Sequence, residues 1–460
     1  MNIVAHVLAA VALVASARAV AQPTDGTLDP FLKETGRDFV LENAWLIDGS
    51  GGPVRDAMTI HIRDGRIAYV GKPLSNPPAG TRRIDLTGHT VLPGLVMMHE
   101  HINYFSGQYV WDAQPGSVPK LLLAAGVTTA RTAGSEAPQV DINLKGRIDA
   151  GLAPGPRLFV TGAYLNGAKG GFLGDTVVSS HADGREVTAY WAARGATSVK
   201  AYSDIPIEAL RGAVDEANRR GIHVAGHLGE TSCTAAANAG IHTIEHSLTS
   251  CAKDLGIAPE AFGTFRYDPT SEAARNLVAL LVSKRVVMIA TPPPTEPYQP
   301  TPEELSMLSP DQRERYDQMV KSPPPWILPK PALLSWNEAH RAFERDFVKA
   351  GGRLLIGADA SDFGLVPGYA NHNAIIALVR AGFRPEQVFR FATKDAADFL
   401  GIGADRGSVT IGRWADLVIV KGAPDQRIED VRNVTIVFKD GLAFDPVKLR
   451  AASKGLLGQH

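Results

Sequence analysis

The sequence predicts an α/β fold in which a (β/α)8 TIM barrel is joined to a small β-sandwich domain. Between about residues 90 and 400, short apolar segments alternate with helical segments rich in Ala, Leu and Arg, as the eight units of a barrel do. His, Lys and Asp recur where several of these apolar segments end, and the C-terminal ends of barrel strands are where functional residues gather. A doubly wound sheet would also fit the alternation, but the placement of the polar residues favours the barrel.

Eight segments have the character of barrel strands. They are 91–101, 126–134, 157–165, 197–203, 223–229, 243–249, 286–292 and 354–361.

Both ends of the chain have a different residue pattern. Apolar and polar residues alternate with period two, and Asp-Gly and Gly-Gly pairs separate the runs, as in short antiparallel strands. The runs are 38–49, 57–71, 81–88, 408–422 and 434–441. Because chain ends are often close in space, we expect both ends to pack into one small sandwich.

The composition excludes some classes of protein. Of 460 residues, 45% are hydrophobic and 21% charged, so the chain can bury a large core. With 47 Lys and Arg against 48 Asp and Glu, no net field attracts nucleic acid or an anionic membrane. Two cysteines are too few for a four-cysteine zinc site, so any metal would be bound mainly by His and carboxylates.

The first 21 residues have the pattern of a secretory signal peptide. Val7–Ala15 is too short an apolar run to span a bilayer, and Ala19-Val20-Ala21 is a small-x-small cleavage site. Because Lys and Arg are missing before the apolar run, a buried N-terminal helix is the alternative. We expect an exported protein, periplasmic or secreted. The predicted divisions are a signal peptide at 1–21, a composite β-sandwich from 22–89 and 401–460, and a barrel at 90–400.

His99 and His101 end the first predicted barrel strand. Alternate residues of a strand face the same side, so the two imidazoles can chelate one metal while Glu100 faces away. A His-x-His pair alone is weak evidence, and its position after an apolar run strengthens it.

Lys200 lies in the fourth predicted strand, where its ammonium would point into the barrel. A buried unpaired lysine is costly, so it either reaches the rim, pairs with Asp359, or is carboxylated by carbon dioxide to a carbamate that bridges two cations. Composition does not decide among these.

The fifth, sixth and eighth strands supply His227, His246 and Asp359 at their C-terminal ends. Asp359 can ligate a metal and also accept a proton. His223 and His242 lie earlier in their strands, toward the face of a barrel associated with stability, and we assign them structural roles.

Four imidazoles, one lysine and one aspartate are more ligands than one tetrahedral ion needs. We therefore predict two divalent metals, with carboxylated Lys200 and a hydroxide as bridges. The donors suit Zn best, and also Mn, Co or Fe.

Taken together, these motifs resemble the amidohydrolase superfamily, in the binuclear branch that contains prolidase-like and imidazolonepropionase-like proteins. The resemblance covers nearly all of the chain after residue 21, and its motifs are VLPGLVMMHEH, GVTTARTAG, SVKAYS, HVAGHL, TIEHS, GADAS and GSVTIGRWADLVIV. It implies that His99, His101 and Asp359 hold one ion and His227 and His246 the other, with carboxylated Lys200 between them. Lys200 argues against imidazolonepropionase and deaminase activity, because those relatives use one metal and lack this lysine.

The substrate pocket does not carry over from the family. The peptidase relatives tend to have Ser-Gly-Gly after the lysine, whereas this chain has Ala201-Tyr202-Ser203-Asp204. Where relatives often read His-x-Glu-Leu it reads His372-Asn373-Ala374-Ile375, and Arg131-Thr132-Ala133-Gly134 lacks the acidic residue that relatives often have after the Arg. The sequence therefore does not indicate a prolidase.

The expected function is hydrolysis of amide or peptide C–N bonds in N-acyl amino acids, dipeptides or related amides by a metal-activated hydroxide. Asp359 would move the proton, Tyr202 would donate to the oxyanion, and His372 would contact substrate; packing roles are the alternatives for Tyr202 and His372. Lactone, ester or phosphotriester hydrolysis on the same centre is an alternative function, and so is a non-catalytic scaffold. We expect a small-molecule partner, no nucleic acid or membrane partner, and a homo-oligomer as one option.

Two further features carry expectations. Residues 292–331 hold 12 of the 31 prolines, which favours extended backbone over the barrel mouth, with Tyr298 and Trp326 as apolar contacts; a solvated excursion is the alternative. Cys233 and Cys251 each follow a predicted ligand strand by a few residues. A disulfide between them would fit an oxidising compartment, and two buried thiols are the alternative.

Overall fold

The computed structural model describes residues 26–74, 79–107, 110–169, 174–258, 264–291, 300–323, 328–362 and 364–459. The predicted signal peptide lies outside these residues, and so do Tyr298 and Trp326. No helix in the described ranges is long and apolar enough to cross a membrane.

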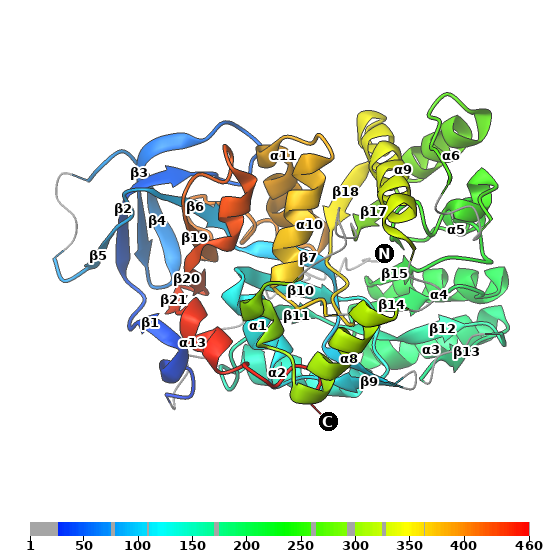
Figure 1. Cartoon of the computed structure of the whole chain (residues 1–460), viewed down its shortest axis with the longest axis horizontal. Coiled ribbons are helices and arrows are strands. Elements are labelled where there is room, and N and C mark those ends of the chain that lie inside the picture. Colours follow the sequence, from blue (N-terminus) through cyan, green and yellow to red (C-terminus); the bar gives the residue numbers. More distant parts are fainter. Residues whose placement is uncertain are drawn as a thin grey trace, which may run out of the picture.

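Strands from both ends of the chain share one nine-stranded sheet, which lies at the left of Figure 1. The two ends join where β6 pairs antiparallel with β19, and Phe39 packs against Phe438 with ring centroids 5.2 Å apart. The sheet comprises β1 (Leu32–Glu34), β2 (Phe39–Leu46), β3 (Arg55–Arg63), β4 (Arg66–Gly71), β5 (Arg82–Asp85), β6 (His89–Pro93), β19 (Leu417–Lys421), β20 (Val434–Lys439) and β21 (Leu442–Phe444).

The described middle of the chain contains two parallel sheets with ten strands in all, and the eight predicted strand positions lie among them. The three-stranded sheet has the order β11-β10-β7, and the seven-stranded sheet has the order β13-β12-β14-β15-β16-β17-β18. The strands are β7 (Leu95–Glu100), β10 (Val127–Thr132), β11 (Arg157–Phe159), β12 (Thr161–Asn166), β13 (Thr176–Val177), β14 (Ser198–Ala201), β15 (His223–Gly226), β16 (Thr243–Glu245), β17 (Val287–Ala290) and β18 (Arg353–Ile356).

The two sheets meet at both of their junctions. The third predicted strand is divided at Val160 into β11, which pairs with β10, and β12, which pairs with β14. At the other junction the N–H groups of Ala358 and Asp359 donate to the carbonyl of His99, 3.2 and 3.0 Å away. The described residues thus form a mixed α/β arrangement with the predicted strand order. The hydrogen bonding between strands is interrupted between the two sheets rather than continuous around them.

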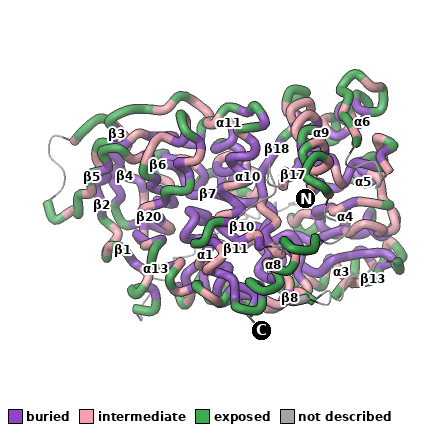
Figure 2. Tube along the Cα trace, in the orientation of Figure 1, coloured by how far each residue is buried: buried purple, intermediate pink, exposed green. Residues whose placement is uncertain are grey.

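Helices surround these strands, and the purple interior of Figure 2 shows how fully the strands are buried. The helices are α1 (Val118–Ala124), α2 (Pro138–Asp149), α3 (His181–Ala193), α4 (Ile207–Arg220), α5 (Cys233–Asn238), α6 (Glu272–Ser283), α7 (Pro302–Leu305), α8 (Pro310–Lys321), α9 (Lys330–Lys349), α10 (Tyr369–Arg380), α11 (Pro385–Arg390), α12 (Ala396–Phe399) and α13 (Pro446–Ala451). Local sequence explains their ends: Ser180 and Asp183 form a reciprocal capping box at α3, and Gly221 ends α4 in the left-handed conformation.

The proline-rich stretch differs from the expectation of extended backbone. Within its described part lie α7 and α8, and a proline occupies the first turn of each, where a missing N–H costs no hydrogen bond. Met307 and Leu308 between these helices are buried in the main core. The side chain of Gln312 in α8 donates to the carbonyl of Phe105, 2.6 Å away, so α8 contacts the hairpin β8 (Asn103–Gly107) and β9 (Val110–Ala113).

Cys233 and Cys251 form a disulfide, with Cα atoms 5.2 Å apart. Cys233 begins α5 after β15, and Cys251 precedes a short 3-10 helix, Ala252–Leu255, after β16. The bond therefore joins the segments that follow His227 and His246, as the sequence predicted.

We expect the double variant Cys233→Ala/Cys251→Ala to lose about 3 kcal/mol of unfolding free energy, because the bond closes a loop of 18 residues in the unfolded chain. Urea unfolding under oxidising conditions measures the loss. Reduced wild type keeps both buried sulfur atoms and should lose a similar amount. Equal stability of oxidised and reduced wild type would contradict this account.

Candidate metal centre

One pocket collects most of the side chains that the sequence singled out. It has a volume of about 220 Å³ and lies at the C-terminal ends of the central strands. The predicted residues that line it are His99, His101, Lys200, Tyr202, His227, His246 and Asp359. Asn103, Trp111, Ala133, Glu136, Tyr164, Ser361 and Asp362 complete the lining.

β7 presents its two histidines as the strand alternation predicted. His99 and His101 face the pocket, while Glu100 points the other way and accepts hydrogen bonds from the Asn371 side chain (2.7 Å) and the Ala358 N–H (3.2 Å). Burial raises the pKa of Glu100 to about 8. Glu100 therefore connects β7 to α10 and to the loop that carries Asp359.

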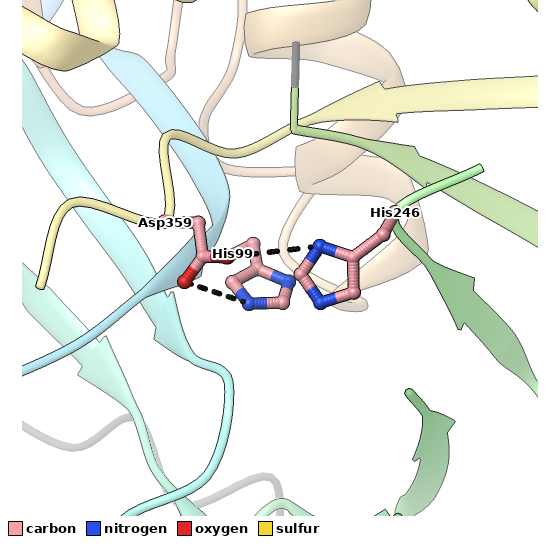
Figure 3. Close-up of side chains that lie close together, drawn as sticks. All are labelled: His99, His246 and Asp359. Atoms are coloured by element: carbon pink, nitrogen blue, oxygen red, sulfur yellow. Dashed lines mark ion pairs between the residues drawn. The ribbon is translucent and has the colours of Figure 1, made fainter. Parts of the chain in front are cut away.

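Asp359 lies close to His99 on β7 and to His246, which directly follows β16 (Figure 3). Its Oδ1 is 3.4 Å from His99 Nε2 and 3.1 Å from His101 Nε2, and its Oδ2 is 3.7 Å from His246 Nδ1. Burial alone would raise the pKa of Asp359, but the charge of His99 and hydrogen bonds from both β7 histidines hold it well below its usual value. The carboxylate is therefore ionised and available as a ligand.

Two of these residues have unusual backbone conformations. His246 has φ 59° and Asp359 has φ 52°, in the left-handed region that residues with a Cβ rarely adopt. Such strain persists only where the surroundings hold it, and it is common at functional sites. At His246 it also breaks the strand alternation, so that Glu245 and His246 both reach the interior.

Lys200 is fully buried at the base of the pocket, with 1% of its surface exposed. Its ammonium forms no ion pair or hydrogen bond with a residue that the structure describes, so the predicted alternative of a salt bridge to Asp359 is not found. Burial lowers the pKa of Lys200 to about 8. A lysine in this position is poised for chemistry that removes its positive charge.

His227 stacks on Tyr202, with ring centroids 4.5 Å apart, and meets the ring of His246 at the same distance. Burial lowers the pKa of His227 to about 3 and that of His246 well below its usual value. Both imidazoles are therefore neutral, the form that binds metals. Burial raises the pKa of the Tyr202 hydroxyl, which keeps it a hydrogen-bond donor.

Sequence reasoning missed a buried support beneath His99. Glu245 Oε2 lies 2.6 Å from His99 Nδ1, and Arg131 donates to both oxygens of Glu245 at 2.8 and 2.9 Å. Burial alone would raise the pKa of Glu245, but the charges of Arg131 and Lys200 and the hydrogen bond from His99 hold it well below its usual value. A carboxylate on one imidazole nitrogen turns the other nitrogen toward a metal.

We expect Glu245→Gln to weaken metal binding about 10- to 100-fold, because His99 loses its anionic partner. Unfolding free energy should also fall by about 3–5 kcal/mol, since Arg131 is left as an unpaired buried charge. Competition with a chromophoric chelator and urea unfolding measure the two effects. As a control, Glu216→Gln removes ion pairs to Arg185, Arg219 and Arg220 outside the pocket. A stability loss with unchanged metal affinity would leave Glu245 a purely structural role.

His372 does not line the pocket, which agrees with the packing role that the sequence left as the alternative to substrate contact. It is buried in the first turn of α10, where its Nε2 donates to the carbonyl of Ala125, 2.8 Å away. His223 and His242 also lie outside the pocket, with rings 5.2 Å apart and His223 stacked on Phe399. These last two positions agree with the structural roles predicted for them.

The donors in the pocket fit divalent metals of the borderline class. Ligand atoms of His99, His246 and Asp359 all lie within 4.8 Å of one another, and His101, His227 and Lys200 line the same cavity. Neutral imidazoles and an ionised carboxylate are the donors that zinc and its neighbours take. The structure thus brings all six predicted ligands to one place, while their roles as ligands stay a prediction.

Fold and pocket together define an α/β protein with a histidine-rich candidate metal centre at the ends of parallel strands. Residues 90–443 match the amidohydrolase family, and the chain belongs to that family.

Curated relatives are similar over short regions. The N-acyl-D-glutamate deacylase of Alcaligenes xylosoxydans xylosoxydans is 48% identical over 64 residues, which cover 14% of this chain and 12% of the relative. A dihydroorotase of Pelobacter propionicus is 29% identical over 140 residues, 29% of this chain and 31% of the relative. The chain therefore matches less than a third of the length of either protein.

Solved structures are similar over nearly the whole chain. A putative prolidase from Bifidobacterium longum has a TM-score of 0.68 at 24% identity and covers 88% of this chain and 94% of its own. A Xaa-Pro dipeptidase with bound methionine has 0.66 at 22%, covering 89% and 100%. Bottromycin amidohydrolase has 0.69 at 23%, covering 94% and 95%. At these identities the likeness shows the fold, and the amidohydrolase fold implies a TIM barrel with a second domain.

Proposed function

We propose that the protein is a metal-dependent hydrolase that cleaves amide or peptide-type C–N bonds. One observation carries the proposal: four imidazoles, a buried lysine without an ion-pair partner among the described residues, and an ionised aspartate converge on one pocket. The N-acyl-D-glutamate deacylase and the Xaa-Pro dipeptidase among the similar proteins support this class of bond.

The proposed centre holds two divalent ions, most simply zinc. His99, His101 and Asp359 would hold one and His227 and His246 the other, with Lys200 as the bridge. Bound there, two cations would supply Lewis acidity toward a carbonyl and lower the pKa of water. Carbamate formation requires neutral amine, and the lowered pKa of Lys200 increases the neutral fraction.

The chain's own groups would manage the proton and the developing charge. Asp359 is ionised and faces the cavity, so one of its oxygens can accept the proton of the attacking water and return it to the leaving nitrogen. Tyr202 keeps its hydroxyl proton and lines the same cavity, where it can donate to the oxygen of a tetrahedral intermediate.

A substrate panel tests the proposed activity. Metal-loaded protein is assayed with dipeptides, N-acyl amino acids, lactones and aryl esters, and kcat/KM is compared before and after treatment with a chelator. We expect amides or dipeptides to be hydrolysed and activity to disappear with the metal. Turnover of lactones or esters alone would favour the alternative function, lactone or ester hydrolysis at the same centre. Inactivity of a metal-loaded sample on every substrate would contradict the proposal.

The same proposal extends to the barrel, the companion β domain and the N-terminal segment. We infer that the two central sheets form the (β/α)8 barrel at 90–400 and that 22–89 and 401–460 form the companion β domain. We also propose that residues 1–21 direct export, and the Cys233–Cys251 disulfide supports an oxidising destination. N-terminal sequencing of the exported protein, with cleavage expected before Gln22, tests that step.

A further inference from the structure

The pocket continues past the proposed ligands to three polar side chains from different strand ends. Asn103 begins β8, Glu136 follows β10, and Asp362 follows β18. All three line the cavity, and none belongs to the group whose ligand atoms lie within 4.8 Å of one another. They are therefore placed to contact a molecule in the pocket.

All three side chains carry hydrogen-bond acceptors. The Asn103 amide nitrogen donates to a carboxylate oxygen of Glu136, and because a carboxylate only accepts, this bond fixes the orientation of the amide. Asn103 is 5% exposed, and its Oδ1 is buried without a hydrogen-bond partner. Within the described residues, neither Glu136 nor Asp362 forms an ion pair. A buried acceptor left unpaired beside a carboxylate indicates that a donor is missing.

Basic side chains are few in the same pocket. Of the described residues that line it, only Lys200 is a lysine or arginine, and Lys200 lies among the proposed ligands. The internal segments outside the described residues contain no lysine or arginine in their sequences, so they cannot supply a cationic partner. These segments are 75–78, 108–109, 170–173, 259–263, 292–299, 324–327 and 363.

We propose that Glu136, Asp362 and the Oδ1 atom of Asn103 form a subsite for an ammonium group of the substrate. The assignment rests on the proposed function and narrows its substrates to amides or dipeptides that carry a free amine. An ammonium is compact, positively charged and has three N–H donors, which suits a site that offers acceptors and carboxylates. A substrate carboxylate at this place would instead face two like charges.

The buried state of the two carboxyls agrees with this assignment. Burial raises the pKa of Glu136 and of Asp362, in each case as the largest cause. The charge of His101 lowers both values and does not compensate for burial. A bound ammonium would favour the ionised form of both groups. It could be the amino terminus of a dipeptide or a lysine-like side chain.

Four hydroxamates that share a six-carbon chain and a metal-binding head distinguish the possibilities. Hexanohydroxamate is neutral, norleucine hydroxamate carries an α-ammonium, 6-aminohexanohydroxamate carries a terminal ammonium, and adipic acid monohydroxamate carries a terminal carboxylate. Their affinities for metal-loaded protein are measured by isothermal titration calorimetry, which does not depend on turnover.

We expect one of the two amines to bind about tenfold or more tightly than hexanohydroxamate, as charge-assisted hydrogen bonds allow, and the carboxylate to bind more weakly. Tighter binding of norleucine hydroxamate would assign the subsite to the amino terminus of a substrate. Tighter binding of 6-aminohexanohydroxamate would assign it to a basic side chain. Glu136→Gln should lower the affinity for the preferred amine far more than that for hexanohydroxamate. Glu230→Gln removes an exposed carboxylate on the loop after β15 and should leave all four affinities unchanged.

Two results would overturn the subsite. If hexanohydroxamate binds as tightly as both amines, or if the carboxylate binds best, the ammonium assignment is wrong while the metal centre stands. If none of the four binds, the metal centre itself fails, and the subsite that depends on it fails with it.

Discussion

We expect Lys200→Ala to lose most of its bound metal and to retain less than about 1% of wild-type activity, because the proposed bridge between the two ions is gone. Short carboxylic acids such as acetate or propionate should restore part of the activity by occupying the space of the carbamate. Metal content and kcat/KM, each measured with and without added acid, check both statements.

Lys200→Met and Lys169→Ala control for unfolding and for general loss of charge. Methionine fills the buried volume of Lys200 but has no oxygen that could bridge two metal ions. Lys200→Met should therefore lose as much metal as the alanine variant while remaining folded. Lys169 is exposed on the loop after β12 and should be replaceable without effect. Wild-type metal content in Lys200→Ala would mean that this lysine is an unmodified structural residue.

Asp359→Asn should reduce kcat about 10²- to 10⁴-fold, the range of a general acid–base group, while metal content falls much less. Asparagine keeps the size of the side chain and an oxygen that can still ligate, but it cannot accept the proton. Steady-state kinetics together with metal analysis of the same sample separates these two roles.

Ser361→Ala is the matched control, since Ser361 lines the pocket from the same loop and is assigned no part in proton transfer. A near-normal kcat for Asp359→Asn would mean that another group moves the proton. Equal losses of metal and of kcat would reduce Asp359 to a ligand alone.

Strand patterning was sufficient to predict the strand order and seven of the fourteen residues that line the pocket. His99 and His101 share a face because side chains alternate along β7, and Lys200, His227 and Asp359 converge because parallel strands end at one edge. The two β-rich ends join in one sheet because their apolar faces complete a common core.

Other features depend on conformations or contacts that periodicity does not encode. Strand alternation would turn Glu245 away if His246 faces inward, and only the left-handed backbone at His246 lets both reach the interior. The long-range pair of Glu245 with Arg131 gave no local signal except two charged residues inside buried strands. The sequence left two roles open for His372, because a histidine that packs a helix against its neighbour looks, in sequence, like one that faces a ligand.

Proline content was also misleading between residues 300 and 323. Proline density favours extended backbone on average, but at the first position of a helix the fixed φ angle and the missing N–H are both compatible with helix. Pro302 and Pro310 occupy such positions. Each proline is therefore compatible with a helix start, although the overall proline content predicted neither helix.

The number of metal ions bound per chain tests the central claim most directly. Purified full-length protein, prepared without added chelator and with its concentration set by amino-acid analysis, is measured by inductively coupled plasma mass spectrometry. The account predicts two divalent ions per chain, with zinc as the main species. A ratio of one would contradict the binuclear centre, and a protein that takes up no ion even after incubation with zinc would contradict a metal-dependent hydrolase altogether.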